Sequence, residues 1–236
     1  MTTRVLDWKS RHDPRSLEHP VRTLLHFKPK PKRRLWLPGP ILDQGTEGAC
    51  VGHGWTNELT ASPVRVDLQA AKLAEGWPRQ PQPFAFYLYQ WCKRHDEFAG
   101  EDYDGTSVLT GAQAMKQLGL IESYRWAFTV ADIVDSILIA GPVVLGIAWH
   151  ESMYDAPGGE VAVAGDVVGG HCLLAIGYEP THIFLDGTAG PAIALLNSWG
   201  PTWGKQGVAW IKQADLVKLL RNQGEACVPV HRSFGR

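Results

Sequence analysis

Two hydrophobic patterns follow one another along the chain. The first half carries apolar residues at helical spacing over residues 50–61, 106–119 and 131–140, together with 84–93, which is apolar on nearly every side. The second half carries short apolar runs that are typical of strands, at residues 143–149, 172–178, 192–197 and 207–211. Helices that precede strands in this way predict an α+β fold, with a helical left half and an antiparallel, barrel-like right half that meet at a cleft.

The first 35 residues differ in composition from the rest. They are rich in Pro, Arg and Lys without a sustained helical or strand period, which indicates an extended N-terminal arm over residues 1–35. Residues 36–236 then form one domain, with a left lobe over about 41–130 and a right lobe over about 131–236. Residues 1–40 hold ten Lys/Arg against three Asp/Glu, whereas the remainder holds 13 against 21. We therefore expect the basic arm to dock on its own acidic body, or else on an assembly partner.

The whole chain has a formal net charge of −1, which gives no strong attraction for nucleic acid. One short basic run, Lys28 to Arg34, lacks the interleaved aromatic residues that stack on bases, so we expect no nucleic-acid partner. No apolar run reaches about 18 residues, and no apolar core with a small-residue cleavage site follows Met1. We expect a cytoplasmic protein that has neither a membrane span nor a secretory signal.

Four cysteines in 236 residues are too few for a disulfide scaffold. Cys92, Cys172 and Cys227 are expected to be buried free thiols. A zinc site would have to combine Cys92 and His95 with His171 and Cys172, and adjacent ligands at 171 and 172 fit one tetrahedral site poorly. The three carboxylates of the loop 100–105 match no complete calcium-binding loop and are interpreted as a solvated turn. We therefore expect no metal and no cofactor.

Cys50 ends the stretch Asp43-Gln44-Gly45-Thr46-Glu47-Gly48-Ala49-Cys50, at a predicted junction between a loop and a helix. A cysteine attacks as a thiolate, and its reference pKa of about 8.5 leaves it mostly protonated at neutral pH. A helix N-terminus and a nearby imidazolium both favour the thiolate, so we expect a lowered pKa for Cys50. Gln44, six residues earlier, can donate its side-chain amide to the oxygen that becomes negative during acyl transfer, with the Cys50 backbone N–H as second donor.

Two later stretches supply the other groups of an acyl-transfer site. His171 follows Gly169-Gly170 at the start of a predicted strand, where its ring can project into the cleft. Asn197 begins the run Asn-Ser-Trp-Gly-Pro-Thr-Trp-Gly, the most specific signal in the sequence, and its amide can orient the far nitrogen of the His171 ring. Trp199 in this run is expected to shield that hydrogen bond from water. His53, in the same predicted helix as the cysteine, is the alternative base, but no orienting amide lies nearby in sequence.

In these stretches the chain resembles the papain-like cysteine peptidases over roughly residues 36–212. It is most similar to the compact bacterial members, whose Asp-Gln-Gly, Gly-Gly-His and Asn-Ser-Trp-Gly segments look like those quoted above. The resemblance implies a papain-like fold and endopeptidase activity through an acyl-enzyme intermediate. It also implies that Cys50 attacks, His171 shuttles the proton, Asn197 orients it and Gln44 stabilises the oxyanion.

The same resemblance suggests two substrate-binding residues. Gly105 is similar in placement to the glycine of the family that pairs with an extended substrate backbone, and Trp199 is assigned to the same cleft. Ala49 and Val51 stand where many members carry Ser and Trp, which affects subsite preference and leaves the chemistry intact. The arm is far shorter than the inhibitory pro-segment of secreted members, so control by a full prodomain is not expected.

Two rival functions stay open at this point. Another Cys-His enzyme, such as a cell-wall peptide hydrolase or amidase, would use the same acyl-transfer chemistry, but Gln44 and the Trp-rich run disfavour it. A catalytically silent papain-like scaffold, with the arm as a tether, is disfavoured because the complete site is retained. The sequence thus favours a thiol protease, a hydrolase that acts on polypeptide substrates.

Overall fold

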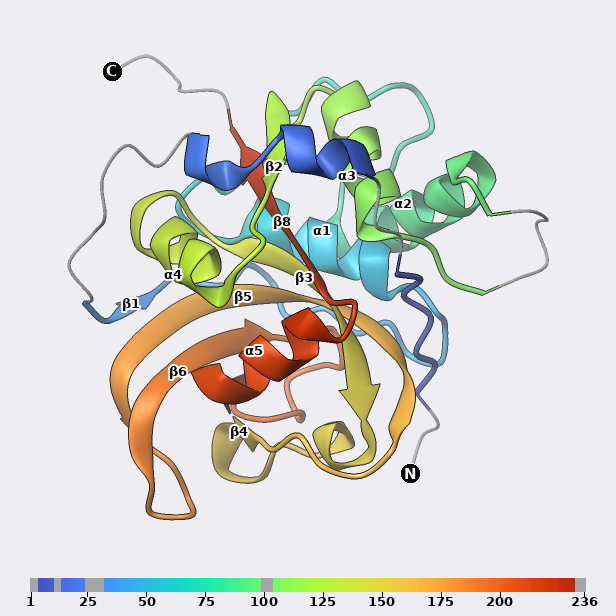
Figure 1. The fold of residues 1–236 in the computed structure, drawn as a ribbon. Coiled ribbons are helices and arrows are strands. Elements are labelled where there is room, and N and C mark those ends of the chain that lie inside the picture. The colour runs from blue at the N-terminus through green and yellow to red at the C-terminus, as the bar shows by residue number, and fades with distance from the viewer. Residues whose placement is uncertain (1–3, 11–13, 24–31, 99–103, 232–236) are drawn as a thin grey trace.

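The computed structural model describes residues 4–10, 14–23, 32–98 and 104–231, and Figure 1 shows their fold. The α-helices are α1 (Cys50–Thr60), α2 (Pro81–His95), α3 (Val108–Gln117), α4 (Val130–Ile139) and α5 (Gln213–Arg221). The strands are β1 (Arg34–Leu35), β2 (Ser123–Trp126), β3 (Val143–His150), β4 (Glu160–Val161), β5 (Val167–Ile183), β6 (Ala189–Leu196), β7 (Val208–Lys212) and β8 (Glu225–Val230). Short 3₁₀ helices lie at Pro14–Glu18, Val21–Thr23, Glu151–Tyr154 and Pro157–Gly159.

One sheet runs through the molecule in the strand order β2-β8-β3-β5-β6-β7-β4, and β1 pairs with β5. The pairs are antiparallel except for β4 with β7. Register shifts in the pairing of β5 with β6 accompany the strong curvature of these two long strands in Figure 1. The predicted α+β fold, with its helices mainly before its strands, is confirmed.

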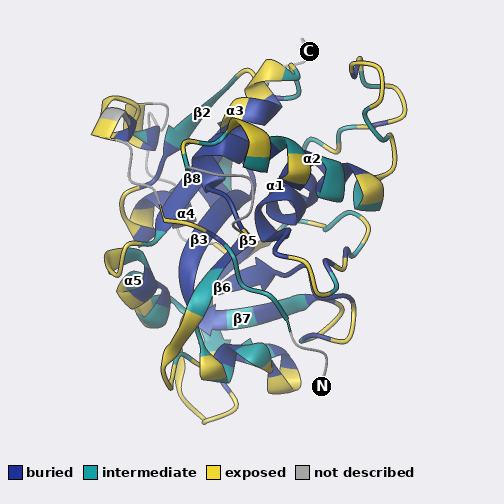
Figure 2. Ribbon diagram, turned by 90° about the vertical axis from the view of Figure 1, so that its right-hand side faces the viewer, coloured by how far each residue is buried: buried dark blue, intermediate teal, exposed yellow. Residues whose placement is uncertain are grey.

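The sheet is buried on both faces, as the dark central strands of Figure 2 show. Along β5, Leu173 and Ala175 belong to the core that also contains buried residues of α4 and α5. The alternate residues Cys172 and Leu174 belong to the core with buried residues of α1, α2 and α3. Because side chains alternate along a strand, His171 shares the face of Leu173. The strand thus fixes the direction in which the histidine ring points.

The four predicted helices are present, and local signals explain two of their ends. The Ser107 hydroxyl caps α3 by accepting the Thr110 backbone N–H at 3.1 Å. Gly119, just after α3, has φ of +70°, the left-handed conformation that glycine adopts at helix ends. The expectation that 84–93 is buried nearly all round is wrong, because Gln90 of α2 is exposed. Helix α2 packs one face on α1 and turns the other outward.

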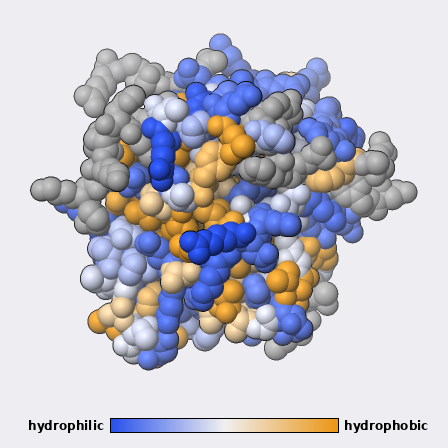
Figure 3. Space-filling view, in the orientation of Figure 1, coloured by the Kyte–Doolittle hydropathy of each residue, from blue (hydrophilic) through white to orange (hydrophobic). Residues whose placement is uncertain are grey.

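Helix α5 and strand β8 are among the elements that were not predicted. Helix α5 is amphipathic: Leu216 and Leu219 are buried, and its hydrophilic residues form part of the surface shown in Figure 3. Strand β8 lies between β2 and β3, although Glu225 and Pro229 interrupt its apolar pattern. A strand with a buried carboxylate and a proline does not show the alternation from which strands are usually identified.

All four cysteines are free and buried, which confirms the prediction for Cys92, Cys172 and Cys227. None of the helices in the described part of the chain is long and apolar enough to cross a membrane. Two sequence interpretations fall largely outside the described residues. These are the basic run that begins at Lys28 and most of the carboxylate-bearing loop 100–105.

Candidate active site

Cys50 is the first residue of α1 and is fully buried. Backbone N–H groups of Cys172, Asp7 and Val51 donate hydrogen bonds to its sulfur. Glycine inside α1 allows this close packing, since a Cβ on Gly54 would lie 2.8 Å from the Cys172 sulfur. The thiol therefore lies between its own helix, strand β5 and the N-terminal arm.

His171 and Asn197 are joined by a hydrogen bond of 2.7 Å between Nε2 and Oδ1. Strands β5 and β6 are paired, and this pairing brings the two fully buried side chains together. The amide oxygen only accepts, so Nε2 carries the proton. Nδ1 of His171 is buried and has no hydrogen-bond partner among the residues that the structure describes. This leaves Nδ1 as the nitrogen that can accept a proton from a reacting group.

Aromatic rings enclose this pair. The Trp199 ring lies 4.9 Å from the His171 ring and the Trp149 ring lies 4.7 Å from it, measured between centroids. Trp199 is 2% exposed. Such rings exclude water from the hydrogen bond between His171 and Asn197. The sequence suggested this position for Trp199, whereas Trp149 was assigned only to a strand.

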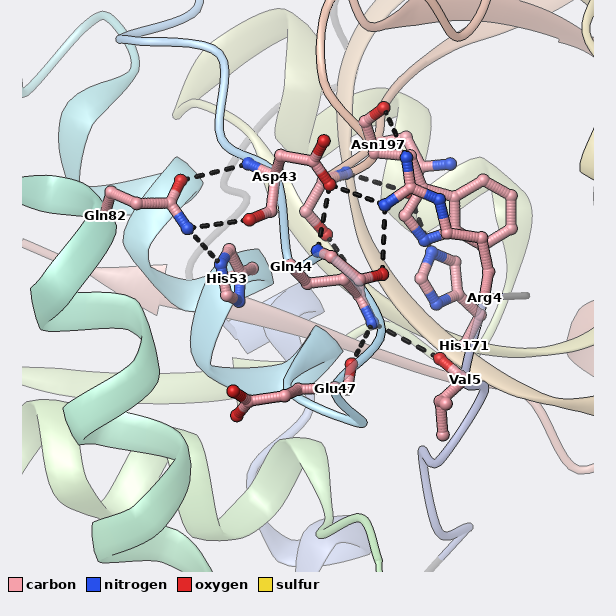
Figure 4. A network of polar contacts seen from close by, with 12 residues as sticks. Arg4, Val5, Asp43, Gln44, Glu47, His53, Gln82, His171 and Asn197 are labelled. Atoms are coloured by element: carbon pink, nitrogen blue, oxygen red, sulfur yellow. Dashed lines mark hydrogen bonds and ion pairs between the residues drawn. The ribbon is translucent and has the colours of Figure 1, made fainter. Parts of the chain in front are cut away.

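Gln44 is fully buried and its side chain is held from both ends. Its Oε1 accepts the Ser198 hydroxyl at 3.0 Å, and its Nε2 donates to the Glu47 carbonyl at 2.8 Å. Nε2 also lies 3.3 Å from the carbonyl oxygen of Val5, which belongs to the arm (Figure 4). The amide predicted to hold an oxyanion thus already donates to a backbone carbonyl.

The arm segment 4–10 crosses the cleft in an extended conformation. The Trp8 backbone N–H donates to Gly170 O at 3.0 Å, and the Lys9 N–H donates to Thr106 O at 3.0 Å. Gly105 is required here, because a Cβ on it would lie 1.6 Å from the Asp7 carbonyl oxygen. The predicted substrate glycine therefore does contact an extended backbone, which in this structure is the chain's own.

Trp8 anchors the arm in a side-chain pocket. Its indole N–H donates to Glu225 Oε1 at 2.8 Å, and the side chain is 7% exposed. Any Cβ on Gly146 would lie 2.2 Å from the indole nitrogen, and one on Gly170 would lie 2.3 Å from the Trp8 carbonyl oxygen. These two glycines make room for the indole and for the backbone that carries it.

Burial changes the protonation of Cys50 and His171. Desolvation raises the pKa of Cys50 to about 11, although three backbone N–H donors oppose this. Desolvation also lowers the pKa of His171 to about 4, against the hydrogen bond to Asn197. The lowered pKa predicted for Cys50 is therefore not found while the arm covers it. A thiol and a neutral imidazole are the stable forms in a cleft from which water is excluded.

Glu225 gives stability a pH dependence of definite sign. Burial raises its pKa from 4.5 to about 8, so between these values the folded chain binds more protons than the unfolded chain. The free energy of unfolding is thus highest below pH 4.5 with respect to this group and decreases as pH rises towards 8. We expect Glu225→Gln to reduce this decrease in urea unfolding at pH 5 and pH 8. Glu122→Gln, which changes an exposed carboxylate, serves as control. If the free energy of unfolding changes equally between pH 5 and pH 8 in the wild type and both variants, Glu225 is not the source of the pH dependence.

His53 is also buried, but both ring nitrogens are already engaged. Nδ1 lies 2.8 Å from Ala49 O, and Nε2 lies 3.1 Å from the Gln82 amide nitrogen. Gln82 in turn holds the backbone of Asp43 (Figure 4). His53 therefore supports the loop that carries Gln44.

No group of three or more His, Cys, Asp or Glu side chains in the described ranges could hold a metal ion. In particular, the zinc ligands considered from the sequence do not form such a group there.

The fold is similar to that of known cysteine proteases. Xylellain, a cysteine protease from Xylella fastidiosa, matches with a TM-score of 0.64 and 14% identity over 97% of both chains. Digestive procathepsin L 3 of Tenebrio molitor larval midgut matches with a TM-score of 0.56 and 15% identity, over 97% of this chain and 74% of that chain. No protein-family model and no curated protein sequence matches. The chain thus has the papain-like fold that its sequence predicts.

Proposed function

We propose that this chain is a cysteine endopeptidase that hydrolyses peptide bonds at Cys50, His171 and Asn197. The observation that carries the proposal is the arm itself. It is an extended polypeptide segment that lies across Cys50, with one carbonyl oxygen on the amide of Gln44. A cleft that binds extended backbone in this way suits a polypeptide substrate.

The reaction would follow from these positions once a substrate replaces the arm. The Cys50 thiol gives its proton to Nδ1 of His171, and the thiolate attacks the carbonyl carbon of the peptide bond. Gln44 Nε2 and the Cys50 backbone N–H stabilise the oxyanion. His171 then gives the proton to the leaving nitrogen as the C–N bond breaks and a thioester forms. Water, deprotonated by His171, hydrolyses the thioester and restores the thiol.

Asn197 acts by fixing the His171 ring, because its oxygen holds Nε2 protonated and directs Nδ1 to the reacting atoms. Gly105 leaves space for the substrate backbone, as it does for Asp7 in the present structure. Trp199 borders the cleft on the side of the leaving group.

The arm is not positioned for its own cleavage. Its group next to the Cys50 sulfur is the Asp7 N–H, whereas the oxygen on Gln44 belongs to Val5, two residues earlier. Attack requires that one carbonyl places its carbon at the sulfur and its oxygen at the amide. We therefore infer that the arm acts as a plug that docks on the body.

We expect a peptidyl epoxide at pH 5.5 to label the full chain once, at Cys50. An isolated thiol is almost fully protonated at this pH, so labelling requires transfer of the thiol proton to His171. His171→Ala should slow labelling by about 100-fold or more. His95→Ala, which changes an exposed histidine stacked on Trp91, is the matched control. Peptide mass spectrometry identifies the labelled cysteine.

Slow labelling spread over Cys92, Cys172 and Cys227 would contradict the proposal. A substrate panel then separates the two rival functions. Cleavage of plain peptides, but not of peptidoglycan fragments, supports the endopeptidase. The reverse pattern supports a cell-wall hydrolase or amidase, and no cleavage of either supports a silent scaffold.

A further inference from the structure

Arg4 of the arm places its guanidinium against four groups of the body (Figure 4). Nη1 donates to Asp43 Oδ1 at 2.5 Å and to Gly45 O at 3.0 Å, and Nη2 donates to Trp199 O at 3.2 Å. The guanidinium carbon also lies 5.8 Å from the centroid of the Trp199 ring. A carboxylate, two carbonyl oxygens and an aromatic face together match a planar group with five N–H donors.

The acidic group of this site is held independently of Arg4. Asp43 Oδ1 accepts the Gly45 backbone N–H at 2.9 Å. The Asp43 main chain is bound on both sides by the Gln82 amide, which accepts its N–H at 3.0 Å and donates to its carbonyl at 2.7 Å. Since these bonds do not involve the arm, the carboxylate keeps its place when the arm leaves.

The aromatic group of the site is also fixed by the body. The Trp199 ring stacks on Tyr154, with centroids 5.6 Å apart and planes inclined by 14°. The ring borders a cavity of about 1080 Å³, which Trp203, Glu151 and Asp155 also help to line. A peptide chain that leaves the guanidinium site in this direction therefore has room, and it meets two further carboxylates.

The site lies on the leaving-group side of the proposed reaction. His171 has to protonate the leaving nitrogen, so the leaving chain must pass over its ring. Trp199, which contributes both a carbonyl and a ring face to the guanidinium, lies 4.9 Å from that ring. The Trp8 pocket, with Glu225 and Gly170, is a separate part of the cleft.

We propose that the site filled by Arg4 is a guanidinium-binding subsite that takes an arginine of the peptide substrate, on the leaving-group side of the scissile bond. The inference rests on the proposed peptidase function. Arg4 and the substrate arginine compete for Asp43, so the arm holds its own subsite closed until it is displaced. Lysine binds less well, because it lacks the planar fork whose two nitrogens reach Asp43 and the Trp199 carbonyl together.

The test uses the full chain with Arg4→Ala and Trp8→Ala, which remove the two side-chain anchors of the arm. This protein digests a proteome-derived peptide mixture, and mass spectrometry gives the residues on both sides of each cut. We expect arginine to be enriched about tenfold over glutamine at one leaving-side position. Asp43→Asn in the same background should remove most of the enrichment. Glu122→Gln, which changes an exposed carboxylate outside this cavity, should retain it.

A binding measurement tests the arginine subsite independently of peptide cleavage. The same background with Cys50→Ala is titrated with a fluorescent peptide copying residues 4–10 and with its Arg4→Gln version. About tenfold tighter binding of the arginine peptide, lost with Asp43→Asn, supports the subsite. Cleavage without Asp43-dependent enrichment, or equal binding of the two peptides, overturns the inference. Selective binding with no cleavage of any peptide would instead overturn the proposed function.

Discussion

Trp8→Ala is expected to raise the rate at which iodoacetamide labels Cys50 by about 100-fold at pH 6. The indole is 7% exposed and donates to the buried carboxyl group of Glu225, so its removal costs the arm about 3 kcal/mol of binding free energy. Labelling requires that the arm opens, and the open population rises by the same factor while the arm stays mostly bound. The measurement is the second-order rate of alkylation at Cys50, followed by peptide mass spectrometry.

Two further variants make this result specific to the arm. Trp8→Phe keeps a ring in the pocket but removes the N–H that Glu225 accepts, so its rate should lie between those of wild type and Trp8→Ala. Trp91→Ala removes a half-buried tryptophan of α2 that stacks on His95, and it should leave the rate unchanged. If Trp8→Ala and Trp91→Ala accelerate labelling equally, the effect comes from general loosening of the fold.

The groups proposed to react could be selected from the sequence because each stands in a distinctive local sequence. Cys50 follows Gln44 at a loop-to-helix junction, and His171 and Asn197 stand at the ends of apolar runs that pair as neighbouring strands. Such signals depend on residues within about ten positions of one another. The hydrogen bond between His171 and Asn197 then follows from the antiparallel pairing of β5 with β6.

The path of the arm could not be predicted in this way. Trp8 bonds to Glu225, which is 217 residues away, and its backbone pairs with Gly170 through groups that every residue possesses. Charge gave only a general attraction between arm and body. Strand β8 was missed for a related reason, because the carboxylate that receives Trp8 interrupts its apolar pattern. Glu225 therefore accounts for both failures: it obscures the strand pattern of β8, and it binds Trp8 through a contact that the sequence does not reveal.

The covered cleft also explains why the predicted thiolate is absent. The prediction assumed a Cys50 that water and the His171 imidazolium can reach, whereas both residues are fully buried in this structure, in which the arm lies across the cleft. Burial disfavours both charged forms, which raises the pKa of the thiol and lowers that of the imidazole. When the arm opens, we therefore expect the Cys50 thiolate and the His171 imidazolium to form, in addition to the sulfur becoming accessible.

Gln44→Ala is expected to lower kcat/KM for peptide cleavage by about 100- to 1000-fold, which is the usual effect of removing one oxyanion donor. Alkylation of Cys50 should not decrease, because iodoacetamide forms no oxyanion. It should even increase somewhat, since Gln44 also donates to Val5 and so helps to hold the arm. Cleavage and alkylation are compared on the same preparations, with a fluorogenic peptide and with iodoacetamide.

Ser198→Ala is the matched variant for this test. It removes the hydroxyl that donates to Gln44 Oε1 at 3.0 Å but keeps the amide itself, so cleavage should fall by only about tenfold. Parallel losses of cleavage and alkylation in Gln44→Ala would mean that the residue supports the loop or the thiol. Opposite changes in the two rates would assign it to the oxyanion, because only that role separates the acylation of a peptide from the alkylation of the same sulfur.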